Sequence, residues 1–226
     1  MNIAILQFGG SNCDLDVQKA LNNLGVSAEL IWYKETLENF DGAIIPGGFA
    51  YGDYLRAGAI AARTKIMQSV REMAADGKPV LGICNGAQIL SESHLVPGTF
   101  TLNRYPKFIC KWVRLKKLAK SPFTLLSNAL VDLPIAHKEG RYVVEPHLLK
   151  ELYENDQVVF KYVDAEGRPT LAANPNGSLD NIAAISNLEK NVLAMMPHPE
   201  RASDKLLGSA DGNAIFECMV RYIKAR

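Results

Sequence analysis

Short apolar runs alternate with helical patterns along the first hundred residues of the chain. Four such runs predict buried strands, at residues 2–8, 27–33, 42–45 and 79–84. Three further segments place apolar residues at helical spacing and predict amphipathic helices, at residues 15–24, 57–75 and 85–93. Strands that alternate with helices through short connections predict an α/β fold with a doubly wound, mostly parallel central sheet flanked by helices. Ligands of such sheets bind at the carboxyl ends of the strands.

The pattern changes after residue 98. Two stretches carry β-like runs broken by Pro and Gly, at residues 98–118 and 122–145, and predict an antiparallel excursion from the parallel sheet. The remaining elements are a short helix at 146–154, strands at 157–163, 182–186 and 192–196, and a closing helix around 214–222. Because no repeat, low-complexity segment or long linker divides the chain, we predict one domain over residues 1–226.

Composition and charge exclude several classes of protein. The 226 residues are 48% hydrophobic and 22% charged, as in ordinary globular domains. A formal net charge of +1 argues against electrostatic binding to nucleic acid or to an anionic membrane surface. No apolar run is long enough to span a membrane, and the first residues lack the basic region of a signal peptide. We therefore expect a cytoplasmic protein.

The four cysteines, Cys13, Cys84, Cys110 and Cys218, are scattered along the chain without a CxxC pair. In a neutral chain without an export signal they are expected to be free thiols. No Cys/His cluster has the spacing of a zinc site, so no metal site is expected. All but Cys84 lack a setting for catalysis and are assigned to packing, although Cys13 falls in a predicted loop.

Cys84 lies at the centre of Gly82-Ile83-Cys84-Asn85-Gly86, where a predicted strand gives way to a helix. This G-x-C-x-G spacing is typical of a nucleophile elbow, a strained turn that exposes the nucleophile at the top of the sheet. The glycines leave room for so tight a turn, and the start of the helix favours a thiolate. The alternative is a small buried thiol, the commonest role of a free cysteine.

His198 is the strongest candidate for the base that a thiol nucleophile requires. It follows the apolar strand 192–196, so it lies at a carboxyl end, on the same sheet edge as Cys84. The flanking Pro197 and Pro199 stiffen the backbone. Glu200 could accept a hydrogen bond from the imidazole and fix its tautomer. The alternative is an ordinary loop histidine. His94 and His147 are assigned to helix ends.

A glycine loop, Pro46-Gly47-Gly48-Phe49, follows the third predicted strand. It is not a phosphate-binding P-loop, because no Lys-Ser or Lys-Thr follows it. Backbone N–H groups of this loop and of Asn85 could bind the oxyanion that forms when Cys84 attacks a carbonyl. A plain tight turn is the alternative for the glycines alone.

The PGG, G-x-C-x-G and PHPE motifs, in this order, resemble those of the class I (triad) glutamine amidotransferases. Other segments are similar to the glutaminase subunits of phosphoribosylformylglycinamidine synthases: QFGGSNCDLD, PGGFAYGDYLRAGAIAA, GICNGAQIL, FICKWVRL, PIAHKEGRY, NPNGS with IAAISN, and VLAMMPHPER. They cover nearly the whole chain and imply a flavodoxin-like fold. Two departures, Ala87 in place of a frequent Phe and Gly9-Gly10 in place of Pro-Gly, concern the shape of the pocket.

The resemblance implies a role for each matching residue. Cys84, His198 and Glu200 would be nucleophile, base and orienting acid, and Gly48 and Asn85 would supply the oxyanion donors.

Four more residues match family signatures outside the triad. Gln88 would help to hold glutamine. His137, Glu139 and Arg141 form a signature that would contact substrate or a partner, with structural hydrogen bonding as the alternative.

The resemblance implies a glutaminase that hydrolyses glutamine to glutamate and ammonia. The ammonia would pass to an ATP-dependent synthetase that converts formylglycinamide ribonucleotide to formylglycinamidine ribonucleotide in purine biosynthesis. The implied partners are a large synthetase subunit and a small third subunit. This chain would bind no cofactor itself, and the synthetase would use ATP and Mg. The alternatives are a stand-alone thiol hydrolase or peptidase, a non-catalytic scaffold, and a glutaminase that serves another synthetase.

Overall fold

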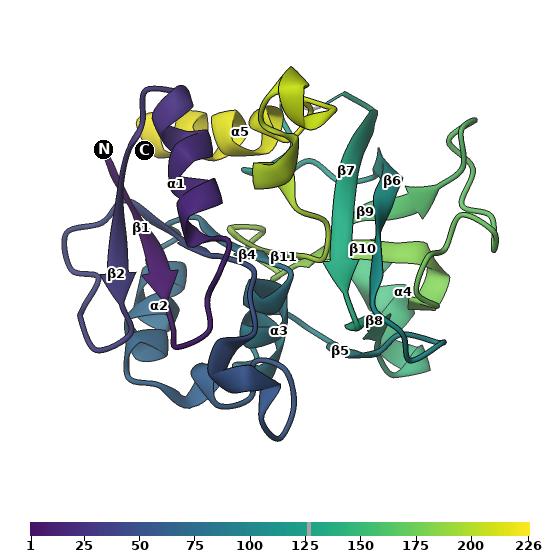
Figure 1. Cartoon of the computed structure of the whole chain (residues 1–226), viewed down its shortest axis with the longest axis horizontal. Coiled ribbons are helices and arrows are strands. Elements are labelled where there is room, and N and C mark those ends of the chain that lie inside the picture. Colours follow the sequence, from purple (N-terminus) through teal and green to yellow (C-terminus); the bar gives the residue numbers. More distant parts are fainter. Residues whose placement is uncertain (126–127) are drawn as a thin grey trace.

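The computed structural model of the chain describes residues 1–125 and 128–226. Part of the predicted β-rich range 122–145, residues 126–127, therefore lies outside the described residues. A nine-stranded sheet of order β2-β1-β3-β4-β11-β10-β9-β6-β7 runs through the molecule (Figure 1). A separate two-stranded sheet joins β5 (Thr99–Leu102) to β8 (Glu139–Val143). The predicted α/β class is confirmed.

One half of the large sheet is parallel throughout. Its strands are β2 (Ser27–Trp32), β1 (Asn2–Gln7), β3 (Gly42–Ile45), β4 (Val80–Ile83) and β11 (Val192–Met195). Every residue of the three inner strands β3, β4 and β11 is buried, as expected where both faces of a parallel sheet are covered. This explains why they appear in the sequence as short continuous apolar runs.

The other half of the sheet is antiparallel. Its strands are β10 (Ile182–Ser186), β9 (Val158–Val163), β6 (Ile109–Lys117) and β7 (Leu130–His137). Within the described sheet, only β10 and β6 run against the direction of the parallel strands. The predicted antiparallel excursion is confirmed, and it extends further than the sequence indicated because β9 and β10 also pair antiparallel.

Five α-helices are present in the described chain: α1 (Asp14–Asn23), α2 (Ile66–Ala75), α3 (Asn85–Glu92), α4 (Pro146–Glu154) and α5 (Asn213–Lys224). Short 3-10 helices occur at Ala50–Asp53, Ala61–Arg63, Leu179–Asn181, Pro199–Ala202 and Lys205–Leu207. A Cβ on Gly42 would meet α5, and one on Gly82 would meet α3. Gly82 pairs with Ile45, so the two residues face the same side of the sheet. Ile45 is three residues after Gly42 on the same strand, so Gly42 faces the other side. Helices α3 and α5 therefore cover opposite faces of the sheet.

The helix predicted over 57–75 is shorter than expected. Only Ile66–Ala75 is α-helical, and the preceding segment holds one 3-10 turn, Ala61–Arg63. Thr64 is extended, and Gly58 has a φ of +81° where it packs against the backbone of Gln88. The alanines of this segment are buried, so their spacing in the sequence reflects burial and does not indicate a helix.

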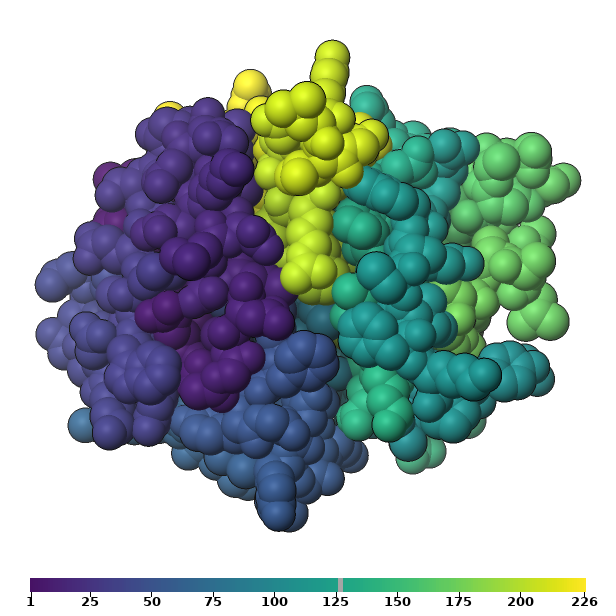
Figure 2. Space-filling model, in the orientation of Figure 1, coloured from purple at the N-terminus to yellow at the C-terminus, as the bar shows by residue number. Residues whose placement is uncertain are grey.

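The core is one continuous cluster that extends along the whole large sheet. In the space-filling view, the yellow segment that follows β11 lies between the purple N-terminal half and the teal strands (Figure 2). Among the described residues, no helix has the length and apolar character needed to cross a membrane.

Candidate active site

The loops that follow β3, β4 and β11 meet at one edge of the sheet. These strands are adjacent and parallel, so their carboxyl ends lie side by side. The loops carry Gly47 and Gly48, Cys84, and His198. The loop after β1 joins them, because Ser11 forms a β-bridge with Gly48. The predicted gathering of these residues on one sheet edge is confirmed.

Cys84 occupies a strained turn between β4 and α3. Its φ of 52° and ψ of −105° lie where L-residues rarely occur, as expected for a nucleophile elbow. A Cβ on Gly86 would come within 1.9 Å of the Ile45 carbonyl oxygen, and one on Gly82 within 2.6 Å of the Gly86 oxygen. Both glycines are therefore required by backbone contact. The Cys84 thiol donates to the Ala136 carbonyl oxygen at 3.6 Å.

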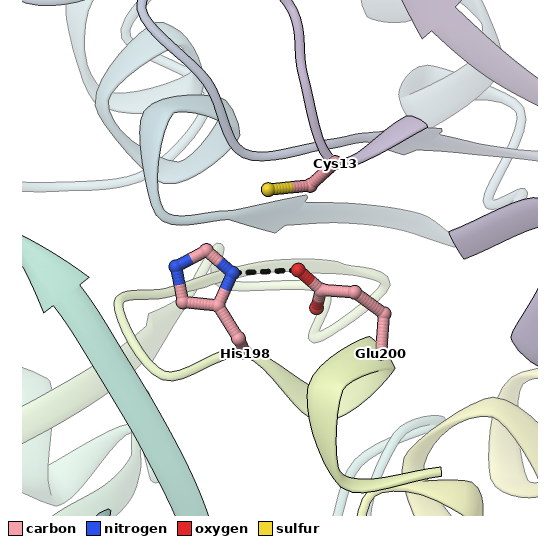
Figure 3. A group of neighbouring side chains, drawn as sticks. All are labelled: Cys13, His198 and Glu200. Atoms are coloured by element: carbon pink, nitrogen blue, oxygen red, sulfur yellow. Dashed lines mark hydrogen bonds and ion pairs between the residues drawn. The ribbon is translucent and has the colours of Figure 1, made fainter. Parts of the chain in front are cut away.

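His198 and Glu200 form a buried pair beside the elbow. The two side chains are 2% and 0% exposed, and His198 Nδ1 lies 2.6 Å from Glu200 Oε1 (Figure 3). The backbone N–H of His198 donates to the Pro134 carbonyl oxygen at 2.8 Å, which ties the loop to β7. The short 3-10 helix Pro199–Ala202 turns Glu200 back toward the ring. Nε2 has no hydrogen-bond partner within the described chain and is the nitrogen left to serve the sulfur.

The pKa of His198 is raised well above its ordinary value. Burial opposes the charged form, but the charge of Glu200 and the nearby sulfurs of Cys84 and Cys13 outweigh it. This shift favours the imidazolium form of His198 at neutral pH. A positive ring at this position favours negative charge on the Cys84 sulfur, as nucleophilic attack requires.

The glycine loop lies next to the nucleophile. A Cβ at Gly47 would be 3.5 Å from Cys84 Cβ. The Gly47 carbonyl oxygen accepts from the N–H groups of Asn12 and Cys13, at 3.2 and 3.1 Å, and the Phe49 N–H donates to Gly10 at 2.9 Å. These bonds fix the loop against the segment after β1.

Asn85, the other predicted oxyanion donor, is the first residue of α3, where backbone N–H groups have no partner within the helix. The structure thus brings Gly48 and Asn85 to the sheet edge of Cys84. Their function as oxyanion donors remains a prediction.

Gln88 lies one helical turn beyond Cys84, and its N–H donates to the Cys84 carbonyl oxygen at 3.2 Å. Its side chain is buried and both amide atoms have protein partners. Asn85 Nδ2 donates to Oε1 at 2.9 Å, and Nε2 donates to the Glu139 carbonyl oxygen. Gln88 therefore connects the elbow helix to the start of β8, and the predicted contact with glutamine remains a prediction.

The signature residues His137, Glu139 and Arg141 take separate positions. His137 is buried, and its Nδ1 lies 3.1 Å from Asn103 Oδ1, so the structural alternative holds for that nitrogen. Burial, and then the charge of His198, lower the pKa of His137 to about 3, so the ring is neutral. Its Nε2 is buried without a partner in the described residues. Arg141 is exposed and donates to the Gly177 carbonyl oxygen at 3.1 Å.

Asp53 belongs to this site but was not selected from the sequence. Burial and the charge of Glu139 raise the pKa of its carboxyl to about 6. Its Oδ1 lies 3.4 Å from Asn85 Nδ2, so it faces the start of the elbow helix. The signal that could have found it is the GDYLRAG segment, which matches the family signature and contains an acidic residue.

Cys13 is the second residue that sequence reasoning missed. It is buried, as packing predicts, but its sulfur lies beside His198 and Glu200 (Figure 3). One donor atom from each of the three residues lies within 4.8 Å of the others, the donor set of a thiophilic cation. The surroundings do not fit a cation, because Arg201 donates to the sulfur at 3.0 Å and Nδ1 is already bonded to Glu200.

Comparison with known proteins agrees with this geometry. The family model of the CobB/CobQ-like glutamine amidotransferase domain matches residues 1–218. The chain is 58% identical to phosphoribosylformylglycinamidine synthase subunit PurQ of Methanosarcina acetivorans, over 99% of this chain and 98% of the relative. It is 49% identical to the PurQ subunit of Pyrococcus horikoshii over 99% of both chains.

Solved structures share the fold. The structure of PurLQS from Thermotoga maritima matches with a TM-score of 0.88 and 38% identity, over 98% of both chains. A glutamine amidotransferase of Thermotoga maritima has a related fold, with a TM-score of 0.58 at 14% identity over 100% of this chain and 92% of that one. The chain belongs to the CobB/CobQ-like glutamine amidotransferases and, within them, to the PurQ subunits of phosphoribosylformylglycinamidine synthase.

Proposed function

We propose that this chain is the glutaminase subunit of a phosphoribosylformylglycinamidine synthase. It hydrolyses glutamine to glutamate and ammonia and supplies the ammonia to an ATP-dependent synthetase that makes formylglycinamidine ribonucleotide. The observation that carries the proposal is the strained backbone of Cys84 beside the buried pair of His198 and Glu200. The PurQ identity of the relatives supports the choice of synthetase.

In the first half of the reaction, the Cys84 thiolate attacks the side-chain amide carbon of glutamine. The resulting oxyanion accepts hydrogen bonds from the backbone N–H groups of Gly48 and Asn85, each worth about 10²–10³ in rate. His198 donates its proton to the leaving nitrogen, the C–N bond breaks, and ammonia departs. Glu200 keeps the ring oriented while its charge changes.

In the second half, His198 is neutral and can take a proton from a water molecule. The hydroxide attacks the γ-glutamyl thioester, the C–S bond breaks, and glutamate leaves with the Cys84 thiolate restored. Gln88 helps to hold the substrate from the elbow helix, directly or by fixing the chain at Glu139. His137 is neutral and buried, and contact with substrate or a partner is its proposed role, as it is for Glu139 and Arg141.

The acceptor chemistry requires other subunits. The sequence contains no nucleotide-binding motif, so we assign ATP and Mg to a large synthetase subunit and propose a small third subunit as well. The solved PurLQS structure supports such an assembly. A cytoplasmic location is part of the proposal, because glutamine and ATP are supplied there.

The test uses the complex with the synthetase subunits. We expect Cys84→Ala to lower glutamine hydrolysis about 10⁴-fold or more while synthesis from ammonium salts continues. Cys110→Ala, which removes an exposed thiol on β6, is the matched control and should retain both activities. Undiminished glutamate release by Cys84→Ala would contradict the mechanism. Glutaminase activity that no synthetase stimulates would favour a stand-alone hydrolase.

A further inference from the structure

The sulfur of a second thiol, Cys13, lies within 4.8 Å of a donor atom of each residue of the catalytic pair. Cys13 precedes α1, and its sulfur points toward the His198 ring and the Glu200 carboxylate (Figure 3). A Cβ on Gly47 would lie 2.8 Å from His198 Cε1, 3.0 Å from Cys13 Sγ and 3.5 Å from Cys84 Cβ. The three side chains therefore converge on the space that the missing side chain of Gly47 leaves open.

The sulfur of Cys13 is hydrogen-bonded to two neighbouring side chains. It donates to Asn12 Oδ1 at 3.1 Å and accepts from Arg201 Nη2 at 3.0 Å. Arg201 also pairs with Asp16 at 3.8 Å, so its guanidinium is held between α1 and the loop after β11. A thiol that both donates and accepts is oriented in a way that a packing residue is not.

Each residue of the catalytic pair has one polar side-chain atom that lacks a hydrogen bond within the described part of the chain. Glu200 Oε2 and His198 Nε2 are buried, and neither has a hydrogen-bond partner among the described residues. A buried carboxylate oxygen without a hydrogen bond is costly, so nearby polar groups decide whether the pair keeps its orientation. The Cys13 thiol is such a group, because its sulfur lies within 4.8 Å of a donor atom of each residue of the pair, and Arg201 donates to that sulfur.

We propose that Cys13 is a positioning residue of the glutaminase reaction, whose sulfur, held by Arg201, lies beside the His198 imidazolium and keeps it against Glu200. The inference rests on the proposed function, because it concerns how His198 is kept ready to protonate ammonia. Cys13 does not touch the reacting amide. It acts through His198, from the residue that precedes α1.

The expected pH effect follows from the groups that face His198. Burial lowers its pKa. Glu200 in its own loop, Cys84 at the elbow and Cys13 before α1 raise it, whereas His137 on β7 is neutral. Removal of Cys13 takes away one of the raising contacts, so the pKa of His198 falls. Because the imidazolium must protonate the leaving nitrogen, the alkaline limb of the kcat profile then moves to lower pH.

The experiment compares Cys13→Ala, Cys13→Ser and the wild type in the full complex, with Cys218→Ala as a control for loss of a buried thiol on α5. For Cys13→Ala we expect kcat for glutamine hydrolysis to fall about tenfold and the alkaline limb to shift down by about half a pH unit or more, with little change in KM. Cys13→Ser should recover part of both, because a hydroxyl can also accept from Arg201. Cys218→Ala should keep the wild-type profile.

An unchanged pH profile in Cys13→Ala would overturn the proposal, whatever the loss of rate. If Cys13→Ala does not fold, Cys13→Ser provides the test. Its shorter C–O bond predicts a smaller shift of the alkaline limb in the same direction, and an unshifted limb would overturn the proposal. Failure of the proposed function would give a different result, because Cys84→Ala would then hydrolyse glutamine at the wild-type rate.

Discussion

His198 and Glu200 bury opposite charges next to a thiol that must react. Such a pair costs desolvation, which the 2.6 Å hydrogen bond and the nearby sulfurs offset. The benefit is chemical, because an imidazolium that is fixed in place can stabilise the thiolate and then protonate ammonia without reorganisation. The single residue with the strongest influence on this balance is Glu200.

Replacement of Glu200 by Gln keeps the shape of the side chain and removes its charge. We expect kcat for glutamine hydrolysis to fall about 10²–10⁴-fold, because the ring loses the acceptor that fixes its tautomer and stabilises its charge. The pKa of His198 should fall in the variant, as read from its imidazole signal in an NMR titration. Activity within twofold of wild type would contradict the role of Glu200.

The same pair predicts how stability depends on pH. Since the folded-state pKa of His198 lies above its ordinary value of 6.5, the contribution of the pair is fully present below about pH 6.5 and is lost as pH rises through the raised pKa. The difference in free energy of unfolding between wild type and Glu200→Gln should therefore shrink above neutral pH. Urea unfolding at a series of pH values measures it, and a difference that grows with pH would contradict the sign.

At the scale of elements, the site depends on how closely α3 approaches β3. The elbow turns so sharply that the backbone of Gly86 lies against the carbonyl of Ile45. This contact carries the start of the helix, and with it Cys84 and Asn85, to the glycine loop. The spacing of the two glycines is therefore a property of backbone packing as well as of the turn.

The contact predicts an unusual response to alanine. Within a helix Gly→Ala normally stabilises by about 0.5–1 kcal/mol, but the Cβ of Gly86→Ala would lie 1.9 Å from the Ile45 oxygen. We expect a loss of about 1–3 kcal/mol in the free energy of unfolding, together with lower glutaminase activity. Gly9→Ala is the control, because its Cβ would meet no atom within 4 Å. Equal urea midpoints for the two variants would exclude the proposed clash.

At the scale of the molecule, the parallel and antiparallel halves share one sheet and one core. Strand β11 carries the His198 loop and pairs in parallel with β4 on one side and antiparallel with β10 on the other. Cys84 approaches Ala136 of β7, so the site itself joins the two halves. No buried boundary divides the described core.

A shared core predicts cooperative unfolding of the whole chain. We expect one thermal transition, with equal calorimetric and van't Hoff enthalpies, and the same midpoint from near-UV and far-UV circular dichroism. This outcome would support the prediction of one domain over residues 1–226. Two separable transitions would show that the antiparallel half folds on its own.

Local patterns in the sequence predicted most of the elements and the main site. The apolar runs gave the strands, and the glycines around Cys84 and the prolines around His198 marked turns whose geometry is set within a few residues. Because parallel strands align their carboxyl ends, the shared sheet edge followed from element order alone. The prediction of a helix over residues 57–75 was wrong in length, because buried small residues can recur at the same spacing as the apolar residues of a helix.

The tertiary structure alone decided which distant residues join the site. Cys13 and Arg201 are 188 positions apart in the sequence. They meet because they follow β1 and β11, the two strands that flank the adjacent strands β3 and β4 in the sheet. For a similar reason, the charge of Glu139, at the start of β8, acts on Asp53, in the 3-10 helix Ala50–Asp53. The sequence by itself determined the strands, the elbow and the triad candidates, since these depend on local geometry. The surroundings that charge and orient His198 depend on strand order and long-range packing, which no local pattern contains.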